Sequence, residues 1–114
     1  MSINHSDVGE SLRKIIITGR LDMPGTDSVA SKLETLIAEP KQAVVIDLSS
    51  LRFLASIGIR ALIVSAKTVQ QRGGKLALVV GDSSSVAMSL ESTGLGDMIP
   101  IFKSTSEAEK AVLA

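Results

Sequence analysis

The pattern of apolar residues predicts strands at five places along the chain. Three runs, at 12–18, 43–48 and 76–80, are rich in Ile, Leu and Val, which is typical of strands buried in a sheet. Shorter strands are predicted at 2–6, where polar residues indicate a sheet edge, and at 99–102.

Two long segments between these strands carry apolar residues at helical spacing. We expect the first helix to start at Thr26 or Asp27, either of which can cap it, and to stop at Pro40. The second should start at Ser56 or the next residue and end at Gly73-Gly74, where a left-handed backbone is tolerated.

Two shorter helices complete the pattern. One is expected at 86–91, after candidate caps at 82–85. The other should begin at Ser104, because Ser104 and Glu107 have the spacing of a capping box. The segment 49–55 is interpreted as a loop.

The resulting order, β-β-α-β-α-β-α-β-α, predicts an α/β fold. We expect a single domain over residues 1–114, with a mixed, mostly parallel sheet and helices packed on it. Apolar residues make up 45% of the chain, which is enough for one core, and that core must be aliphatic because aromatic residues are only 2%.

Charge and composition exclude several function classes. Twelve basic residues balance twelve acidic ones, so nothing favours a nucleic acid or an anionic membrane as partner. The chain has no cysteine and a single histidine, His5, which argues against a metal site, thiol catalysis or a Ser-His-Asp triad. Phosphate-binding glycine motifs are missing, and we expect no cofactor and no enzymatic activity.

The segment 47–62 joins the most hydrophobic strand to the second helix, and partners of α/β folds usually approach at the carboxyl ends of strands. Within it, Leu54 and Ile57 flank Ser56 and suit a protein contact if either is exposed. Gly58 costs the helix about 1 kcal/mol relative to Ala, which suggests a close approach to its backbone. From the pattern alone, Ser56 is more often a helix cap than a regulatory switch.

The same residues resemble the STAS domain family, in particular the bacterial anti-sigma factor antagonists. The resemblance covers almost the whole chain and is carried by the following segments, in order: Gly19-Arg20-Leu21-Asp22, Val45-Ile46-Asp47-Leu48-Ser49, Phe53 to Leu62, Thr93-Gly94-Leu95, Ile101-Phe102 and Glu107-Ala108.

This resemblance implies a regulatory protein that sequesters an anti-sigma factor serine kinase, is phosphorylated on a serine and is reset by a serine phosphatase. The phosphorylated serine of the family falls on Ser56. A phosphate of charge about −1.5 to −2 would be tolerated at a helix start in the free protein, but it would weaken binding if it were enclosed in an apolar interface. The residues that we expect to contact the partner are Asp22, Leu54, Ala55, Ile57, Gly58 and Arg60.

Two positions depart from the family pattern. Ala55 stands where many antagonists have Asp, and Ile57 stands where a small polar residue is common. They favour an alternative, a STAS module that does not switch and serves as a scaffold or as a subunit of a lipid transporter. A nucleotide-binding protein is a weaker third class. No signal sequence or bilayer-spanning segment is visible, so we expect a cytoplasmic protein without membrane insertion.

Overall fold

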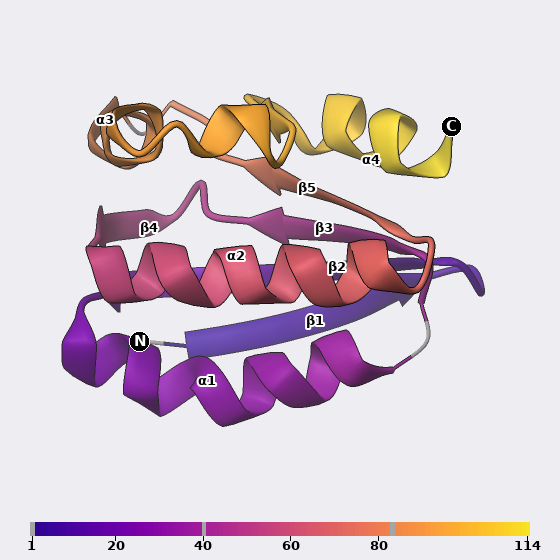
Figure 1. Ribbon diagram of the computed structural model, residues 1–114, viewed down its shortest axis with the longest axis horizontal. Coiled ribbons are helices and arrows are strands. Elements are labelled where there is room, and N and C mark those ends of the chain that lie inside the picture. Colours follow the sequence, from indigo (N-terminus) through magenta and orange to yellow (C-terminus); the bar gives the residue numbers. More distant parts are fainter. Residues whose placement is uncertain (1, 40, 83) are drawn as a thin grey trace.

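Helices cover both faces of a six-stranded sheet in the computed structural model, which describes residues 2–39, 41–82 and 84–114 (Figure 1). The strands are β1 (Ser2–Val8), β2 (Leu12–Leu21), β3 (Ala43–Asp47), β4 (Leu51–Leu54), β5 (Lys75–Val79) and β6 (Ile101–Phe102). The helices are α1 (Met23–Ala38), α2 (Ser56–Gln71), α3 (Ser84–Ser92) and α4 (Thr105–Leu113), with a short 3-10 helix at Leu95–Asp97.

The sheet has the strand order β1-β2-β3-β5-β6, with β1 antiparallel to β2 and the other pairs parallel. The short strand β4 lies off this path and continues the line of β3, because it pairs in parallel with the last three residues of β2. The single-domain α/β fold with a mixed, mostly parallel sheet is therefore confirmed.

Apolar side chains form one cluster on each face of the sheet, because successive strand residues point to opposite faces. The larger cluster joins α1, α2 and α3 to the sheet and includes Ile15, Ile46 and Leu62. The smaller one packs α4 against the other face through Val45, Ala77 and further aliphatic residues. Within the described residues, no helix is long and apolar enough to cross a bilayer.

Several predicted boundaries differ from the structure: β2 continues past 18 to Leu21, and β6 covers only Ile101–Phe102 of the strand expected at 99–102. The predicted loop at 49–55 contains β4, since Leu51 and Leu54 are buried and pair with β2. Helix α1 begins at Met23 because Asp22, rather than Thr26 or Asp27, caps it by accepting a hydrogen bond from the Gly25 amide at 2.9 Å. The helix stop predicted at Pro40 and one of the candidate caps, Ser83, lie outside the described residues.

Candidate functional site

The starts of α1 and α2 meet where β2 and β4 end, on the left in Figure 1. Leu21 and Leu54 are register partners, and the Leu21 carbonyl accepts a hydrogen bond from the Ala55 amide at 2.9 Å. Asp22 therefore comes directly after one of two paired strand ends, and Ser56 comes two residues after the other. This arrangement is the carboxyl edge of the sheet, where ligands and partners of α/β folds usually bind.

Ser56 is the first residue of α2, and it is exposed. The interpretation of Ser56 as the helix cap is wrong. The cap residue is Ala55, whose extended backbone (φ −92°, ψ 170°) suits the position but whose side chain makes no cap hydrogen bond. The amides of the first turn of α2 thus lack a side-chain acceptor at the cap, and the serine hydroxyl next to them is accessible.

Leu54 and Gly58 serve the packing under this site. Leu54 is only 3% exposed, so of the two apolar residues that flank Ser56 it is the buried one and offers little surface for the expected partner contact. A Cβ atom on Gly58 would lie 2.8 Å from the Leu21 Cβ and 2.9 Å from the Leu54 Cδ1. The close approach to the Gly58 backbone therefore exists, but the protein's own strand makes it. Ile57 is half-buried and stays available for contact.

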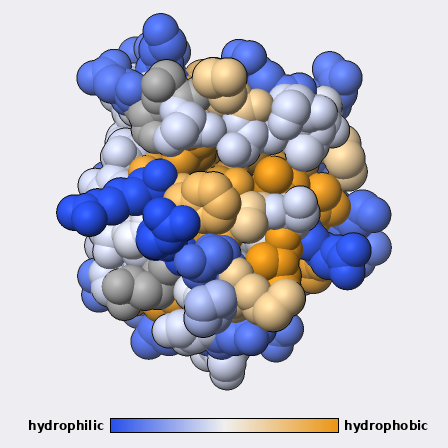
Figure 2. Space-filling view, turned by 90° about the vertical axis from the view of Figure 1, so that its left-hand side faces the viewer, coloured by the Kyte–Doolittle hydropathy of each residue, from blue (hydrophilic) through white to orange (hydrophobic). Residues whose placement is uncertain are grey.

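Sequence reasoning missed two exposed apolar side chains, one three residues before Ser56 and the other directly after Asp22. Phe53 on β4 is 39% exposed, and Met23, the first residue of α1, is 65% exposed. The guanidinium of Arg20 lies over the Phe53 ring, 4.5 Å from its centroid, in a cation–π contact. Figure 2, which looks at this end of the molecule, shows apolar side chains at its centre with hydrophilic ones around them.

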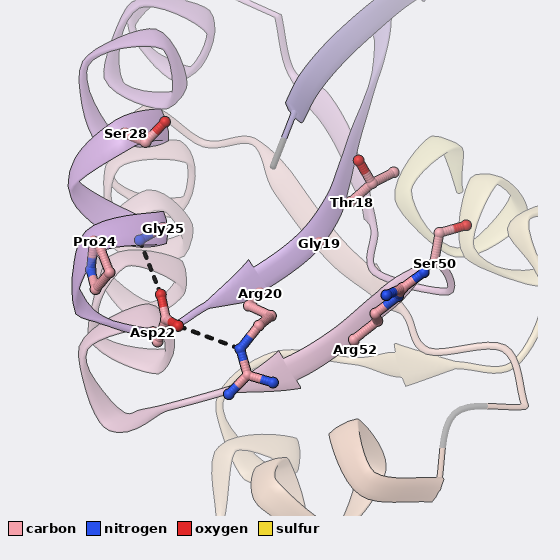
Figure 3. A pocket seen from close by; sticks show the side chains of 9 residues that line it. All are labelled: Thr18, Gly19, Arg20, Asp22, Pro24, Gly25, Ser28, Ser50 and Arg52. Atoms are coloured by element: carbon pink, nitrogen blue, oxygen red, sulfur yellow. Dashed lines mark hydrogen bonds and ion pairs between the residues drawn. The ribbon is translucent and has the colours of Figure 1, made fainter.

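Asp22 is half-buried and ionised at neutral pH. The hydrogen bond from the Gly25 amide holds the pKa of the Asp22 carboxyl below its usual value. The Arg20 guanidinium, whose Nε lies 3.3 Å from the Asp22 Oδ2, lowers this pKa further. Asp22 and Arg20 belong to the lining of an open basin of about 710 Å³, together with Arg52 and small polar residues (Figure 3). Asp22 thus combines its capping role with an ion pair to Arg20, the residue whose guanidinium lies over Phe53.

Arg60 follows Ser56 by one turn of α2 and is exposed. Arg60 lines a second cavity, a groove of about 260 Å³ between α1 and α2, and Ile57 belongs to the same lining. The structure therefore brings together Asp22, Ala55, Ser56 and Ile57 at one end of the molecule and places Arg60 next to them. Among the described residues, no group of three His, Cys, Asp or Glu side chains could hold a metal ion.

Comparison with known proteins shows to which family the chain belongs. The family model described as STAS domain matches residues 8–108. A crystal structure of an anti-sigma factor antagonist from Mycobacterium paratuberculosis matches with a TM-score of 0.90 at 22% identity, covering 99% of this chain and 94% of that one. The phosphorylated form of SpoIIAA, described as a Bacillus cell fate determinant, matches with a TM-score of 0.71 at 19% identity and coverages of 97% and 99%.

A sulfate transporter family protein from Wolinella succinogenes also shares the fold, with a TM-score of 0.76 at 18% identity and coverages of 95% and 89%. No curated protein matches the sequence. At these identities the solved structures establish a common fold.

Proposed function

The chain belongs to the STAS domain family, and from this premise we propose that it is an anti-sigma factor antagonist. In this role it sequesters an anti-sigma factor serine kinase in the cytoplasm and is switched off by phosphorylation of Ser56. A serine phosphatase restores the binding form. The protein then acts by binding and carries out no reaction of its own.

The observation that carries the proposal is an exposed serine hydroxyl at the start of α2 with no capping role of its own. Transfer of the γ-phosphoryl group of ATP to the Ser56 Oγ releases ADP and the hydroxyl proton. The dianion formed would meet the uncapped first-turn amides and the positive end of the helix dipole, which favour it in the free protein. Arg60, one turn further, is within the usual reach of such a group.

The same charge is unfavourable in the complex. A partner covering Ser56 would also meet Ile57, the next residue, and Phe53 at the end of β4, both of which are at least partly exposed. A phosphate enclosed among these apolar side chains loses water without gaining an equivalent partner. The fold is expected to tolerate phosphorylation, whereas the complex is expected to dissociate.

The test is to incubate the purified chain with ATP and GHKL-type anti-sigma factor kinases, and to locate the phosphate by mass spectrometry. We expect phosphate on Ser56. We also expect Ser56→Asp to weaken kinase binding by about tenfold or more, equivalent to about 1.4 kcal/mol, while Ser56→Ala still binds. Thermal unfolding of both variants should match that of the wild type.

Ser106→Asp is a matched control, because Ser106 is an exposed serine in the first turn of α4, which packs on the other face of the sheet. This variant should bind like the wild type. Phosphate on another residue, or an active kinase that leaves the chain unmodified, would remove the switch from Ser56.

A second candidate is a STAS module that does not switch, attached to a transporter or a signalling scaffold. Ala55 at the cap position and the hydrophobic Ile57 favour it, as does the fold shared with a sulfate transporter family protein. An affinity purification that recovers transporter subunits, with no kinase, would decide for this candidate.

A further inference from the structure

The groove between α1 and α2 begins at Ile57, next to Ser56, and apolar side chains from both helices make up half of its lining. On α2 it is lined by a stripe at helical spacing that includes Ile57, Ala61 and Val64. On α1 the facing stripe includes Ala30 and Leu33. Val64 leaves 54% of its surface in solvent, a large fraction for a β-branched apolar side chain.

The rims of this groove carry opposite charges. Asp27 and Glu34 are exposed along the α1 rim, and Arg60 is exposed along the α2 rim. None of these three side chains takes part in an ion pair with another described residue. An apolar floor between an acidic rim and a basic rim favours an occupant that is apolar on one side and oppositely charged along its two flanks.

The backbone of the groove limits the shape of this occupant. Both walls are helices whose backbone groups are bonded within the helix, so an extended strand cannot add to them. Binding must therefore use side chains, as when an amphipathic helix lies in a groove. The lining runs from Ile57 to Ser65 on α2, which corresponds to about 12 Å or two turns of helix.

We propose that the groove between α1 and α2 is the docking site for a short amphipathic helix of the anti-sigma factor kinase, with basic residues facing α1 and acidic residues facing α2. This inference rests on the proposed function, and it extends the interface from Ser56 along the helix pair. Ile57 and Arg60 belong to both surfaces, so a partner that covers Ser56 can continue directly into the groove.

Calorimetric titration with the kinase that binds the wild-type chain tests the proposal. Val64→Asp should weaken binding about tenfold or more, equivalent to about 1.4 kcal/mol. Its matched control is Leu113→Asp on α4, since the two side chains are 54% and 55% exposed, and this variant should bind like the wild type. Both variants should unfold at the wild-type temperature, because neither side chain belongs to the core.

The charged rims give a second, independent measurement. Glu34→Lys and Arg60→Glu should each weaken binding several-fold at low salt, with the loss shrinking as salt rises. Hydrogen exchange of the kinase should show new protection within one helix that carries an apolar stripe. Protection in a strand or loop instead would overturn the inference.

The outcomes separate the two proposals. If Val64→Asp binds as tightly as the wild type while Ser56→Asp does not, the groove inference is wrong and the proposed function stands. If the chain alone forms a dimer that Val64→Asp abolishes in analytical ultracentrifugation, a second copy occupies the groove and the inference is wrong. If no kinase binds the wild-type chain, the proposed function fails and the groove inference fails with it.

Discussion

At the scale of single residues, the site is shaped by side chains that are small or missing. Ala55 leaves the cap of α2 without an acceptor, and Gly58 lets the helix start lie directly on β2. Between them, Ser56 presents its hydroxyl to solvent. The Ser56 hydroxyl is therefore accessible, since neither Ala55 nor Gly58 carries a side chain that could cover it.

Gly58→Ala should destabilise the protein even though Ala is the better helix former. The new Cβ would lie 2.9 Å from the Leu21 carbonyl oxygen, which is part of the β2 backbone and cannot rotate away. Overpacking of this kind costs about 1–3 kcal/mol, more than the roughly 1 kcal/mol gained in helix propensity. Urea denaturation measures the difference.

Gly96→Ala is the control for this substitution, because a Cβ there would meet only the Ile101 Cδ1 at 3.8 Å, an ordinary contact. It should leave the free energy of unfolding nearly unchanged. A Gly58→Ala variant as stable as the wild type would mean that β2 and α2 can separate at no cost.

At the scale of elements, α2 starts differently from α1 and α4. Asp22 caps α1 through the Gly25 amide, and Ser104 caps α4 through the Glu107 amide at 3.2 Å. Helix α2 has no such bond, although its 16 residues match α1 in length. Tertiary packing on the sheet must therefore hold the start of α2, since its own cap does not.

Ala55→Ser should stabilise the protein by about 1 kcal/mol, because a hydroxyl at the cap can accept a hydrogen bond from a first-turn amide. The reciprocal variant, Ser104→Ala, removes the cap of α4 and should destabilise by a similar amount. Thermal unfolding of both variants measures the effects. An Ala55→Ser variant less stable than the wild type would show that the cap position has no room for a side-chain oxygen.

At the scale of the whole molecule, two arginines tie the far end of α1 to the rest of the fold. Arg13, only 3% exposed on β2, donates to the Leu36 carbonyl at 3.0 Å and to the carboxylates of Asp7 and Glu39. Arg72, just after α2, donates to the carbonyls of Ile37 and Lys41. Carbonyls that a helix end leaves unpaired are thus satisfied by other elements.

We expect the ion pairs of Arg13 to make the stability of the protein fall in acid. Hydrogen bonds from Arg13 hold the pKa of both Asp7 and Glu39 below their usual values, so the unfolded chain binds more protons than the folded one. The contribution is fully present above about pH 5 and is lost as the pH falls below about 4, through the lowered values.

Melting temperatures between pH 3 and 8 test this expectation. Asp7→Asn should melt lower than the wild type at pH 7, and the gap should close in acid, where the wild-type carboxylate is protonated. A gap that is constant with pH would show that the ion pair contributes nothing through its charge.

Most of the fold was predictable because its signals are local. The apolar runs of β2, β3 and β5 and the helical stripe of α2 depend only on residue order, and the structure confirms them. Strand β4 escaped prediction because four residues with two exposed positions carry no clear period, and only pairing with β2 makes them a strand. The same pairing exposes Phe53 instead of Leu54.

By itself, the sequence determined the fold class, the order of most elements and the position of Ser56 at a helix start, because periodicity and turn residues act over a few neighbours. Only the tertiary structure decided that Ala55 is the cap and that Asp22 joins Arg20 and the α1 amides. It also decided that α1 and α2 leave an apolar groove between charged rims. These features depend on which strand ends and helix faces meet, and chain order alone does not set such long-range contacts.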